Sequence, residues 1–550
     1  MLERSKALLL AMTALIAAPA AAGPTASFDF VAYEGEAKPS DGQTYANPIL
    51  PGFHPDPSIV KVGADFYLVT STFGWFPGLP VFHSRDLVNW EQIGNAIDRP
   101  GMVDLSRVSL TGDGLYAPAI TWHDGTFYLL NTCVRCDGNF LITATVPAGP
   151  WSDPVPLDFD GIDPSLFVDE DGRGWITYND APEGEPRYDG HRAIWIRQFD
   201  LQTLKLVGEP QVLVDGGVDP AANPVWAEGP HIYKVDGWYY LLAAEGGTAD
   251  QHSQTIYRSR TITGPYAPGP INPILTQRDL PRDRPDRVEA TGHADFVQLD
   301  DGSWWGVFLG TRPFADQDTL MGRETFLLPV TWRDGWPLFL DHGEAVPLTA
   351  GRPALAPAPT PDTSSWRDEF TSARLGPQWL RMRGNAPVQN VSLSDGALHL
   401  VAGPQAISQK AMPAFVGQRL QQHRASMTTT LSFAPQKEGD FAGLAAVASE
   451  EAFASFGLLG TAEGPVLAVL RRDGENAPVN GTVVTSTPWR GDAADLRIEI
   501  DRDKARFSYR TGSRGGWQVL ADGVDIGQLA SVRTNLFTGL VLGPYAYSAQ

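Results

Sequence analysis

The sequence has few basic residues for its length. Its 550 residues include 42 Lys and Arg against 64 Asp and Glu, which gives a formal net charge of −22 at pH 7. Nucleic acids and anionic membrane surfaces attract basic proteins, so this balance argues against either as a partner. The chain also lacks a P-loop run, which disfavours phosphate chemistry. A neutral ligand fits this composition better.

Cysteine and long apolar runs are also scarce. Cys133 and Cys136, in "CVRC", are the only cysteines, and two sulfurs alone make a poor zinc site. Residues 1–22 have a charged start, an apolar run and a final Ala-Ala-Ala, the pattern of a signal peptide. No later stretch reaches the roughly 18 apolar residues that span a bilayer. We therefore expect an exported protein, periplasmic or secreted, with a local disulfide between the two cysteines.

The abundant residues indicate an all-β protein. The chain has 56 Gly, 45 Pro and 16 Trp, with 43% hydrophobic and 19% charged residues, a composition typical of short strands joined by turns. At this length two or three domains are expected, each large enough to bury a core.

An internal repeat defines the first domain. Five segments align without gaps: "DPSIVKVGADFYLVTSTF" from residue 56, "YAPAITWHDGTFYLLNTC" from 116, "DPSLFVDEDGRGWITYND" from 163, "EGPHIYKVDGWYYLLAAE" from 228 and "HADFVQLDDGSWWGVFLG" from 293. Each indicates two strands around a turn that carries Asp or Gly. Units of this spacing match propeller blades of about four strands. The repeat predicts a five-bladed β-propeller over residues 45–347.

The first positions of the five repeats are expected to meet at one mouth of the propeller channel, because the innermost strands of all blades run along it. These positions are Asp56, Tyr116, Asp163, Glu228 and His293. Three carboxylates brought together repel one another and raise a pKa, a cost that favours a functional site. The structural alternative is that Asp-Pro-Ser merely caps each strand and that the glutamate is a coincidence.

The stretch "FHPDPSI" places Asp56 between two prolines. Pro55 has a fixed φ, and Pro57 disfavours the helical region for the residue before it, so we expect Asp56 to be extended and rigid. The heptapeptide alone is equally compatible with an ordinary turn that enters a strand.

Converging carboxylates next to aromatic residues favour glycoside hydrolysis. In that reaction one acid protonates the leaving oxygen, and a second group activates water or attacks the sugar. Phe73, Trp75 and Phe76 in "STFGWFPG", and Tyr116 in "LYAPAI", could form the walls of a sugar pocket, because sugar faces pack on aromatic rings. Each of these residues could equally belong to a blade core.

Residues 45–345 resemble glycoside hydrolase family 43, the five-bladed propeller enzymes that act on xylan and arabinan side chains. The resemblance rests on "NPILPGFHPDPSIVKVGADFYLVTSTFGWFPGLPVFHSRDLVNW", "GIDPSLF", "WAEGPHIYKVDGWYYLLAAEGGT" and "GRET". It implies that Asp56 is the general base and Glu228 the general acid. It further implies that Asp163 tunes the pKa of the acid and orients it.

The same resemblance implies several substrate-binding residues. Arg323 in "LMGRET", or with less support Arg312 in "LGTRP", matches an arginine that reaches the sugar. His293 matches a histidine that in some members binds a metal, such as calcium in the channel, or holds the water network; no cofactor is expected to be required. The chain departs from close relatives at Tyr116, where tryptophan is frequent, and at Ile162, where phenylalanine is frequent. Both would line the sugar site.

The rest of the chain divides into three parts. Residues 23–44 are a lead segment without an assigned fold, and residues 348–365 are rich in Pro, Ala and Thr, which predicts a stiff linker. Residues 366–550 alternate as a β-sandwich requires. In the β-xylosidase branch of the family such a sandwich closes one side of the pocket and favours exo action. Relatives usually continue for another strand, so we expect a sandwich that lacks an edge strand or a shortened chain.

The sequence thus predicts an inverting, exo-acting β-xylosidase that releases xylose from the non-reducing end of xylo-oligosaccharides. An α-L-arabinofuranosidase acting on arabinose-substituted oligosaccharides is the alternative, because both sugars have five carbons and similar hydroxyl placement. A non-catalytic carbohydrate-binding propeller is a third hypothesis. It predicts the loss of at least one of the three acids, and all three are present.

Overall fold

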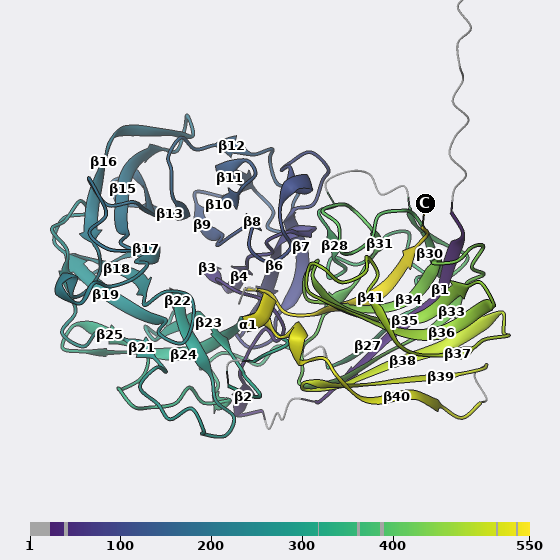
Figure 1. Ribbon diagram of the computed structural model, residues 1–550. Helices are drawn as coiled ribbons and strands as arrows, with labels where there is room; N and C mark the ends of the chain where they lie inside the picture. The colour runs from purple at the N-terminus through teal and green to yellow at the C-terminus, as the bar shows by residue number, and fades with distance from the viewer. Residues whose placement is uncertain are drawn as a thin grey trace, which may run out of the picture.

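The computed structural model describes residues 23–37, 42–316, 318–359, 364–384, 390–512, 515–534 and 537–549. The proposed signal peptide, residues 1–22, lies outside the described residues. The chain is all-β, as predicted, with a five-bladed propeller beside a two-sheet sandwich (Figure 1). In the described part, no helix is both long and apolar enough to cross a bilayer.

Each propeller blade is an antiparallel sheet, and its strands are named here in order from the channel outward. Blade one contains β3 (Ser58–Val62), β4 (Asp65–Val69), β6 (Gly78–Ser84) and β7 (Glu91–Ile97). Blade two contains β9 (Ala119–His123), β10 (Thr126–Val134), β11 (Gly138–Ala144) and β12 (Val155–Pro156), and β8 (Gly114–Leu115) also pairs with β10. Blade three contains β13 (Ile162–Val168), β14 (Gly174–Asp180), β15 (Ala193–Asp200) and β16 (Lys205–Asp215).

The last two blades repeat this pattern. Blade four contains β17 (Glu228–Val235), β18 (Trp238–Glu245), β19 (Ser253–Ser259) and β20 (Ala267–Pro268), with β21 (Leu275–Thr276) also beside β19. Blade five contains β22 (Glu289–Gln298), β23 (Trp304–Thr311), β24 (Glu324–Arg333) and β25 (Trp336–Leu338). Short 3-10 helices η1 (Leu105–Arg107) and η2 (Pro220–Ala222) lie in the loops.

The inner hairpins form where the turn residues predict them. In blade four Asp236 and Gly237 join β17 to β18, with φ of 49° and 71°. In blade two Asp124 and Gly125 do the same, with φ of 45° and 79°. Two successive residues with positive φ match the right-handed twist of the flanking strands, and Asp-Gly adopts that conformation at low cost.

The five inner strands close a ring, because β3 contacts both β9 and β22. The hydroxyl of Ser58 and the backbone N–H of Ile59 both donate to Asp295 Oδ2, at 2.7 and 2.9 Å. Ser58 begins β3 and Asp295 lies in β22, so these bonds join the first blade to the last. The buried carboxylate of Asp295 therefore closes the propeller and is not free for chemistry.

The sandwich consists of two facing sheets. One has the order β29 (Val391–Ser394), β30 (Ala397–Val401), β1 (Thr25–Gly35), β33 (Arg424–Ser432), β38 (Ala493–Asp501), β39 (Lys504–Arg510) and β40 (Gln518–Asp525), with β27 (Ser365–Asp368) beside β1. The other has the order β31 (Ala414–Phe415), β41 (Val541–Tyr547), β34 (Phe441–Val447), β35 (Ala452–Thr461), β36 (Gly464–Asp473) and β37 (Thr482–Pro488), with β32 (Gln418–Arg419) beside β41.

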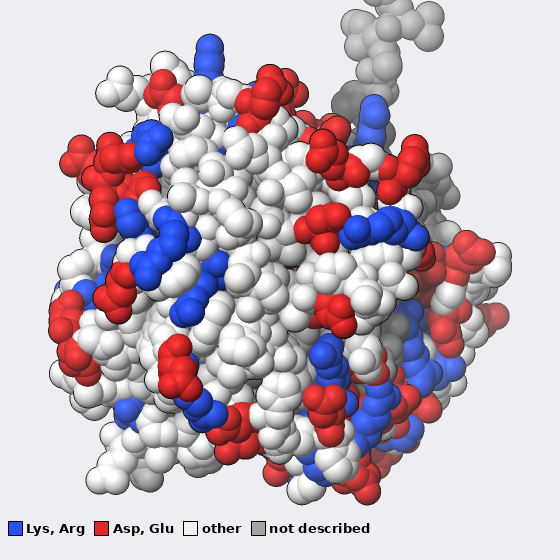
Figure 2. All heavy atoms as spheres, turned by 90° about the vertical axis from the view of Figure 1, so that its left-hand side faces the viewer, with Lys and Arg blue, Asp and Glu red and all other residues white. Residues whose placement is uncertain are grey.

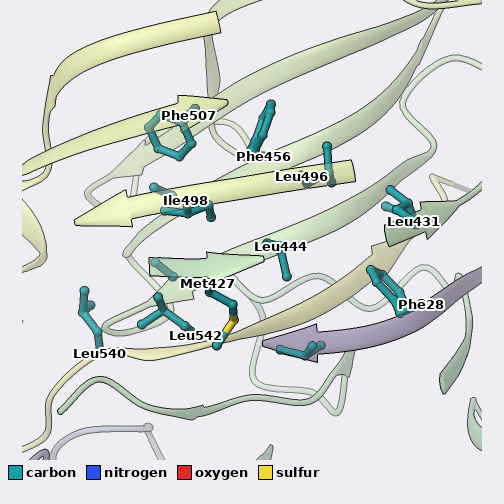
Figure 3. Close-up of a cluster of buried hydrophobic side chains, with 14 of the residues drawn as sticks. Phe28, Met427, Leu431, Leu444, Phe456, Leu496, Ile498, Phe507, Leu540 and Leu542 are labelled. Atoms are coloured by element: carbon teal, nitrogen blue, oxygen red, sulfur yellow. The ribbon is translucent and has the colours of Figure 1, made fainter. Parts of the chain in front are cut away.

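The lead segment is part of the sandwich. Its strand β1 pairs with β30 and β33, where Thr25 lies opposite Val401 and Ser27 opposite Ser432. Figure 3 shows Phe28 pointing into the core that the two sheets share. The separate assignment of residues 23–44 is therefore corrected for Thr25–Gly35, since this strand completes a sheet whose other strands follow the propeller in sequence.

The segment predicted as a linker is fixed to the propeller over its described part. It contains β26 (Thr349–Gly351), which pairs with β2 (Thr44–Ala46). The guanidinium of Arg352 donates to Asp86 Oδ2 at 2.6 Å, and the N–H of Ala358 donates to the same atom at 2.8 Å. A carboxylate of blade one thus holds this segment in place.

The two domains share a buried interface. Strand β28 (Arg381–Met382) of the sandwich domain pairs with β5 (Trp75–Phe76) of the propeller. A second contact comes from the segment that follows η3 (Gly527–Leu529) and contains α1 (Ser531–Thr534). This segment runs from the sandwich toward the middle of the propeller (Figure 1). There the N–H of Leu540 donates to the carbonyl of Leu320 at 2.7 Å.

Two further features of the fold bear on the predictions. Cys133 and Cys136 form a disulfide, with Cα atoms 5.3 Å apart, as predicted. Figure 2 shows acidic and basic side chains interspersed on the propeller face turned away from the sandwich. Lys and Arg do not gather into one patch on that face.

Candidate active site

The channel mouth carries the three predicted carboxylates. Asp56 precedes β3, Asp163 lies in β13 and Glu228 begins β17, so they come from blades one, three and four. All three are buried. The charges of Glu228 and Asp56 both act on Asp163, and Asp56 acts on Glu228. The predicted convergence of the three acids is therefore present in the structure.

The register of Glu228 differs from the gapless alignment. Asp56 precedes Val62, the last residue of β3 before its turn, by six positions, whereas Glu228 precedes the equivalent Val235 by seven. The inner strand of blade four has a register shift between Glu228 and His231. Gly229, with φ of 58°, is therefore the counterpart of Asp56. The prediction that Glu228 occupies the same repeat position as Asp56 is therefore wrong by one residue, because Glu228 lies one position earlier in its strand.

Asp56 is held by contacts and by its backbone. Its φ is 52°, in the left-handed region, so the prediction of an extended residue is wrong. The same conformation occurs at Asp163, with φ of 57°. This conformation is costly for a residue other than glycine and occurs where the surroundings impose it, often at functional sites. The hydroxyl of Ser71 donates to Asp56 Oδ2. Arg323 Nη1 lies 3.5 Å from Asp56 Oδ1.

Glu228 has the environment of a proton donor. Burial raises the pKa of its carboxyl to about 7; the charge of Arg323 opposes this shift, and that of Asp56 adds to it. A carboxyl with a pKa near neutrality keeps its proton where an ordinary glutamate has lost it. Glu228 therefore has the property that a general acid requires.

A buried histidine that the sequence analysis did not identify lies beside this acid. His252 Nε2 is 3.9 Å from Glu228 Oε1. Its Nδ1 lies 3.2 Å from the carbonyl oxygen of Ala290, which can only accept, so Nδ1 carries the proton. Burial lowers the pKa of His252 to about 3, and the imidazole is neutral. No motif in "DQHSQT" distinguishes this histidine from an ordinary core residue.

Asp163 lies close enough to Glu228 for the two carboxyls to influence each other. Burial, and then the charges of Glu228 and Asp56, raise the pKa of Asp163 well above its usual range. The N–H of Gly229 donates to Asp163 Oδ2 at 3.2 Å and opposes this rise. This hydrogen bond ties Asp163 to the residue directly after Glu228.

Aromatic side chains from both domains line one side of the site. Phe73 and Tyr116 meet edge to face, with ring centroids 5.4 Å apart. Phe537, from the segment after α1, stacks on Phe73 at 5.4 Å, and the guanidinium carbon of Arg323 lies 4.7 Å from its ring centroid. Phe537 is not predictable from the sequence, because nothing in the pattern of the sandwich indicates which residue reaches the propeller.

The two candidate arginines have different positions. Arg323 is buried, faces Asp56 and donates to the carbonyl of Thr248 at 2.7 Å. Arg312 instead forms a two-bond ion pair with Glu324, at 2.7 and 2.8 Å, and also donates to the carbonyl of Gln421. Arg312 therefore belongs to the domain interface and not to the sugar site.

Two predicted pocket walls are also corrected. Trp75 is completely buried and packs in a core that includes Phe53 and Phe415, the latter from the sandwich. Phe76 is buried in the core between blades one and two. Both residues pair with β28, so their role is to join the domains. Ile162, by contrast, is half-buried directly before Asp163 and occupies the register position of Glu228.

The metal site suggested for His293 receives little support from its neighbours. His293 Nδ1 lies 3.8 Å from Asp56 Oδ1, and burial lowers the pKa of the imidazole to about 4. Among the described residues no three His, Cys, Asp or Glu side chains converge as metal ligands do. The side chains at this site therefore do not fit a protein-ligated cation.

Comparison with known proteins agrees with this geometry. Residues 45–337 match the model of glycosyl hydrolases family 43, and residues 367–550 match the beta xylosidase C-terminal concanavalin A-like domain. A xylosidase/arabinosidase of Butyrivibrio fibrisolvens is 34% identical over 91% of this chain and 95% of its own length. A non-reducing end alpha-L-arabinofuranosidase of Bacteroides ovatus is 38% identical over 92% of this chain and 91% of its own length.

Solved structures lead to the same family. The crystal structure of a GH43_12 protein from a capybara gut metagenome superposes with a TM-score of 0.87 at 35% identity, covering 96% of this chain and all of that one. The structure of a xylan beta-1,4-xylosidase of Bacillus halodurans superposes with a TM-score of 0.81 at 32% identity, covering 92% of this chain and 96% of that one. With three carboxylates at the channel mouth of a five-bladed propeller, and a family model that spans that whole domain, this chain belongs to glycoside hydrolase family 43.

Proposed function

We propose that this glycoside hydrolase is an inverting, exo-acting β-xylosidase that releases xylose from the non-reducing end of xylo-oligosaccharides. The observation that carries the proposal is the environment of Glu228, a buried carboxyl with a pKa of about 7 beside Asp163 and across the site from Asp56. Two carboxyls in different protonation states are what the hydrolysis of a glycosidic bond requires.

In the proposed reaction Asp56 takes a proton from water, and the water oxygen attacks the anomeric carbon. The bond from that carbon to the glycosidic oxygen breaks, and the Glu228 proton goes to the departing oxygen. Arg323 and Ser71 hold the Asp56 carboxylate in position as the base. Asp163 holds the segment of Glu228 through the N–H of Gly229. Each proton has a donor and an acceptor among these side chains.

Exo action is supported by the aromatic wall. Phe537 covers Phe73 and Arg323 on one side of the carboxylates, so a chain that continued in that direction would meet an aromatic ring from the sandwich. A site closed on one side accommodates the end of an oligosaccharide better than its middle. The relatives named as xylosidases, and the C-terminal domain of the beta xylosidase type, support xylose as the released sugar.

An α-L-arabinofuranosidase is the second candidate. Three relatives carry arabinosidase names, one of them alone and two together with xylosidase. Tyr116 and Ile162 are the residues at the sugar site where this chain departs from its family pattern, so they are the positions at which the choice of sugar would be made.

Side-by-side assays of the purified protein on aryl β-xyloside and aryl α-L-arabinofuranoside test the proposal. We expect the higher kcat/KM on the xyloside, and xylose from the non-reducing end of xylotriose by chromatography. A preference for the arabinofuranoside would favour the second candidate. Inactivity on both would overturn the proposal.

We also propose that the protein is exported. The N-terminal pattern of residues 1–22 is typical of a signal peptide, and the disulfide between Cys133 and Cys136 suits an oxidising compartment. Fractionation of the native host, with the N-terminus of the mature chain sequenced, is the test. We expect cleavage near Gly23, and an intact N-terminus in the cytoplasmic fraction would contradict it.

A further inference from the structure

We propose that Arg192 and Trp226 form the binding site for the sugar that leaves, on the far side of Glu228 from the aromatic wall. The proposal rests on the proposed function, because it assumes that Glu228 protonates the leaving oxygen. The two side chains come from different parts of the chain. Arg192 directly precedes β15 in blade three, and Trp226 lies two residues before Glu228 in blade four.

The ring of Trp226 is held in a costly conformation. Its φ is 54°, which is a genuine outlier for a bulky residue. The neighbouring backbone imposes this conformation. The N–H of Trp226 donates to the carbonyl of Gly190 at 2.9 Å, and the carbonyl of Val225 accepts from Gly246 and Gly247 at 2.8 and 3.2 Å. Strain that the surroundings maintain at a half-exposed aromatic residue beside a catalytic group indicates a binding role.

Arg192 supplies hydrogen-bond donors at the same place. Its guanidinium carbon lies 4.4 Å from the centroid of the Trp226 ring, so the two groups are stacked. Within the described residues, the guanidinium has no hydrogen-bond acceptor and no carboxylate within ion-pair distance. Its charge nevertheless acts on Glu228 and lowers the pKa of that acid. Arg192 is therefore near the acid, with its N–H groups unused by the protein.

A flat ring beside unused donors is suited to a sugar. The ring packs against the C–H groups of a sugar face, and the donors bind its hydroxyls. The position also identifies which sugar is bound. Arg192 acts on Glu228, and Trp226 lies two residues before that acid, whereas Phe537 stacks on Phe73 and lies against Arg323, which faces Asp56. The sugar beyond the acid is the one whose oxygen the acid protonates.

The chain offers a matched control for this pair. Arg258 lies over Trp238 at the same 4.4 Å, also in blade four. Trp238 follows the turn at the opposite end of β17 from Glu228. A Trp238→Ala variant therefore removes a comparable stack from the same blade without approaching the carboxylates.

Two substrates separate the leaving-group site from the rest of the catalytic machinery. Xylobiose has a leaving sugar, whereas β-xylosyl fluoride releases only fluoride; both place the same sugar between Asp56 and Glu228. If the protein releases arabinose instead, the corresponding arabinofuranosides replace them. The measured quantity is the ratio of kcat/KM for the disaccharide to kcat/KM for the fluoride, which cancels damage common to both reactions.

We expect Trp226→Ala and Arg192→Ala each to lower this ratio by about 10- to 100-fold, because each removes contacts to the leaving sugar only. Trp226→Phe, which keeps a ring, should lower it less, and Trp238→Ala should leave it within about twofold. A ratio unchanged in both alanine variants would overturn the inference and leave the proposed function standing. If the wild type cleaves neither disaccharide nor fluoride, the proposed function itself has failed. If Trp226→Ala does not fold, the same ratio measured for Trp226→Phe and Arg192→Ala tests the inference.

Discussion

The ring of Phe537, from the sandwich domain, stacks on the ring of Phe73, from blade one, with centroids 5.4 Å apart and planes 19° apart. The two residues are more than 400 positions apart in sequence, yet they stack, and Phe537 also lies against Arg323, which faces Asp56. The sandwich domain is therefore part of the site and not merely attached to the catalytic domain.

Replacing Phe537 with alanine tests this contribution. We expect kcat/KM on xylobiose to fall roughly tenfold, because the variant loses one aromatic stack and the ring that covers Arg323. Trp366→Ala is the control, since Trp366 stacks on Tyr33 within the sandwich at 5.8 Å and is away from the site. Equal kinetics for the two variants would remove Phe537 from the sugar site.

Replacing Glu228 with glutamine should affect poor leaving groups most. General acid catalysis is worth about 10²- to 10⁴-fold, and it matters most when the departing oxygen is basic. We expect a loss of that size on xylobiose and a much smaller loss on an aryl xyloside whose phenol is acidic. Steady-state rates on both substrates are the measurement. Equal losses would contradict the role of Glu228 as the acid.

The pH dependence tests the pairing of Glu228 with Asp163. The acid must be protonated, so kcat/KM should decline as the pH rises through about 7, the pKa of Glu228. Within this coupled pair, the N–H that Gly229 donates to Asp163 favours the charge on Asp163 and the proton on Glu228. Asp163→Asn removes that neighbouring negative charge, so we expect Glu228 to ionise more easily and its pKa to fall. The alkaline limb of the profile should therefore move to lower pH. A profile that matches the wild type would leave Asp163 with only a structural role.

The residues of this site that could be predicted from the sequence are those marked by a pattern within a few neighbouring positions. Asp56, Asp163 and the turns of the inner hairpins were found because each blade repeats its own local pattern. Glu228 is predicted but placed one residue out of register, because the alignment matches acid to acid, whereas an ungapped alignment that starts at Gly229 gives the register of the structure. The left-handed conformation of Asp56 was missed because Pro57 by itself favours an extended residue, and tertiary contacts overrode that preference.

Contacts between distant segments were not predictable. The strand β1 pairs with strands more than 360 residues later, and neither its length nor its composition identifies those partners. The sequence predicts Trp75 in the sugar pocket, because an aromatic residue near a site and an aromatic residue in an interface look alike in sequence. The contact of Trp75 with Phe415 of the sandwich, which only the structure shows, places Trp75 in the interface.

A buried ion pair within the sandwich domain, at its interface with the propeller, should contribute strongly to stability. Arg383 is completely buried and pairs with Glu450, which also accepts from the N–H of Leu110 at 3.1 Å. Glu450→Ala would leave the guanidinium charge buried without its partner, which costs about 3 to 5 kcal/mol. We expect a melting temperature several degrees lower, and little change for Glu451→Ala, whose side chain is exposed. Equal melting temperatures would show that the pair is not a net contributor.

The stereochemistry of the product tests the role of Asp56. A base that activates water stands roughly 6.5 to 9.5 Å from the acid, whereas a nucleophile stands about 5 to 5.5 Å away. Asp56 and Glu228 lie at the inner ends of blades one and four, so the ring of inner strands sets their separation, and no mobile loop does. With Ser71 and Arg323 holding one carboxylate and the bulge of β17 positioning the other, we expect inversion.

Inversion predicts that the first xylose released from a β-xyloside is the α-anomer, which proton NMR detects before mutarotation equilibrates the sugar. Asp56→Asn should be inactive even on substrates with good leaving groups, because water still has to be activated after the leaving group no longer limits the rate. A β-anomer in the first spectra would mean that Asp56 or another group attacks the sugar directly.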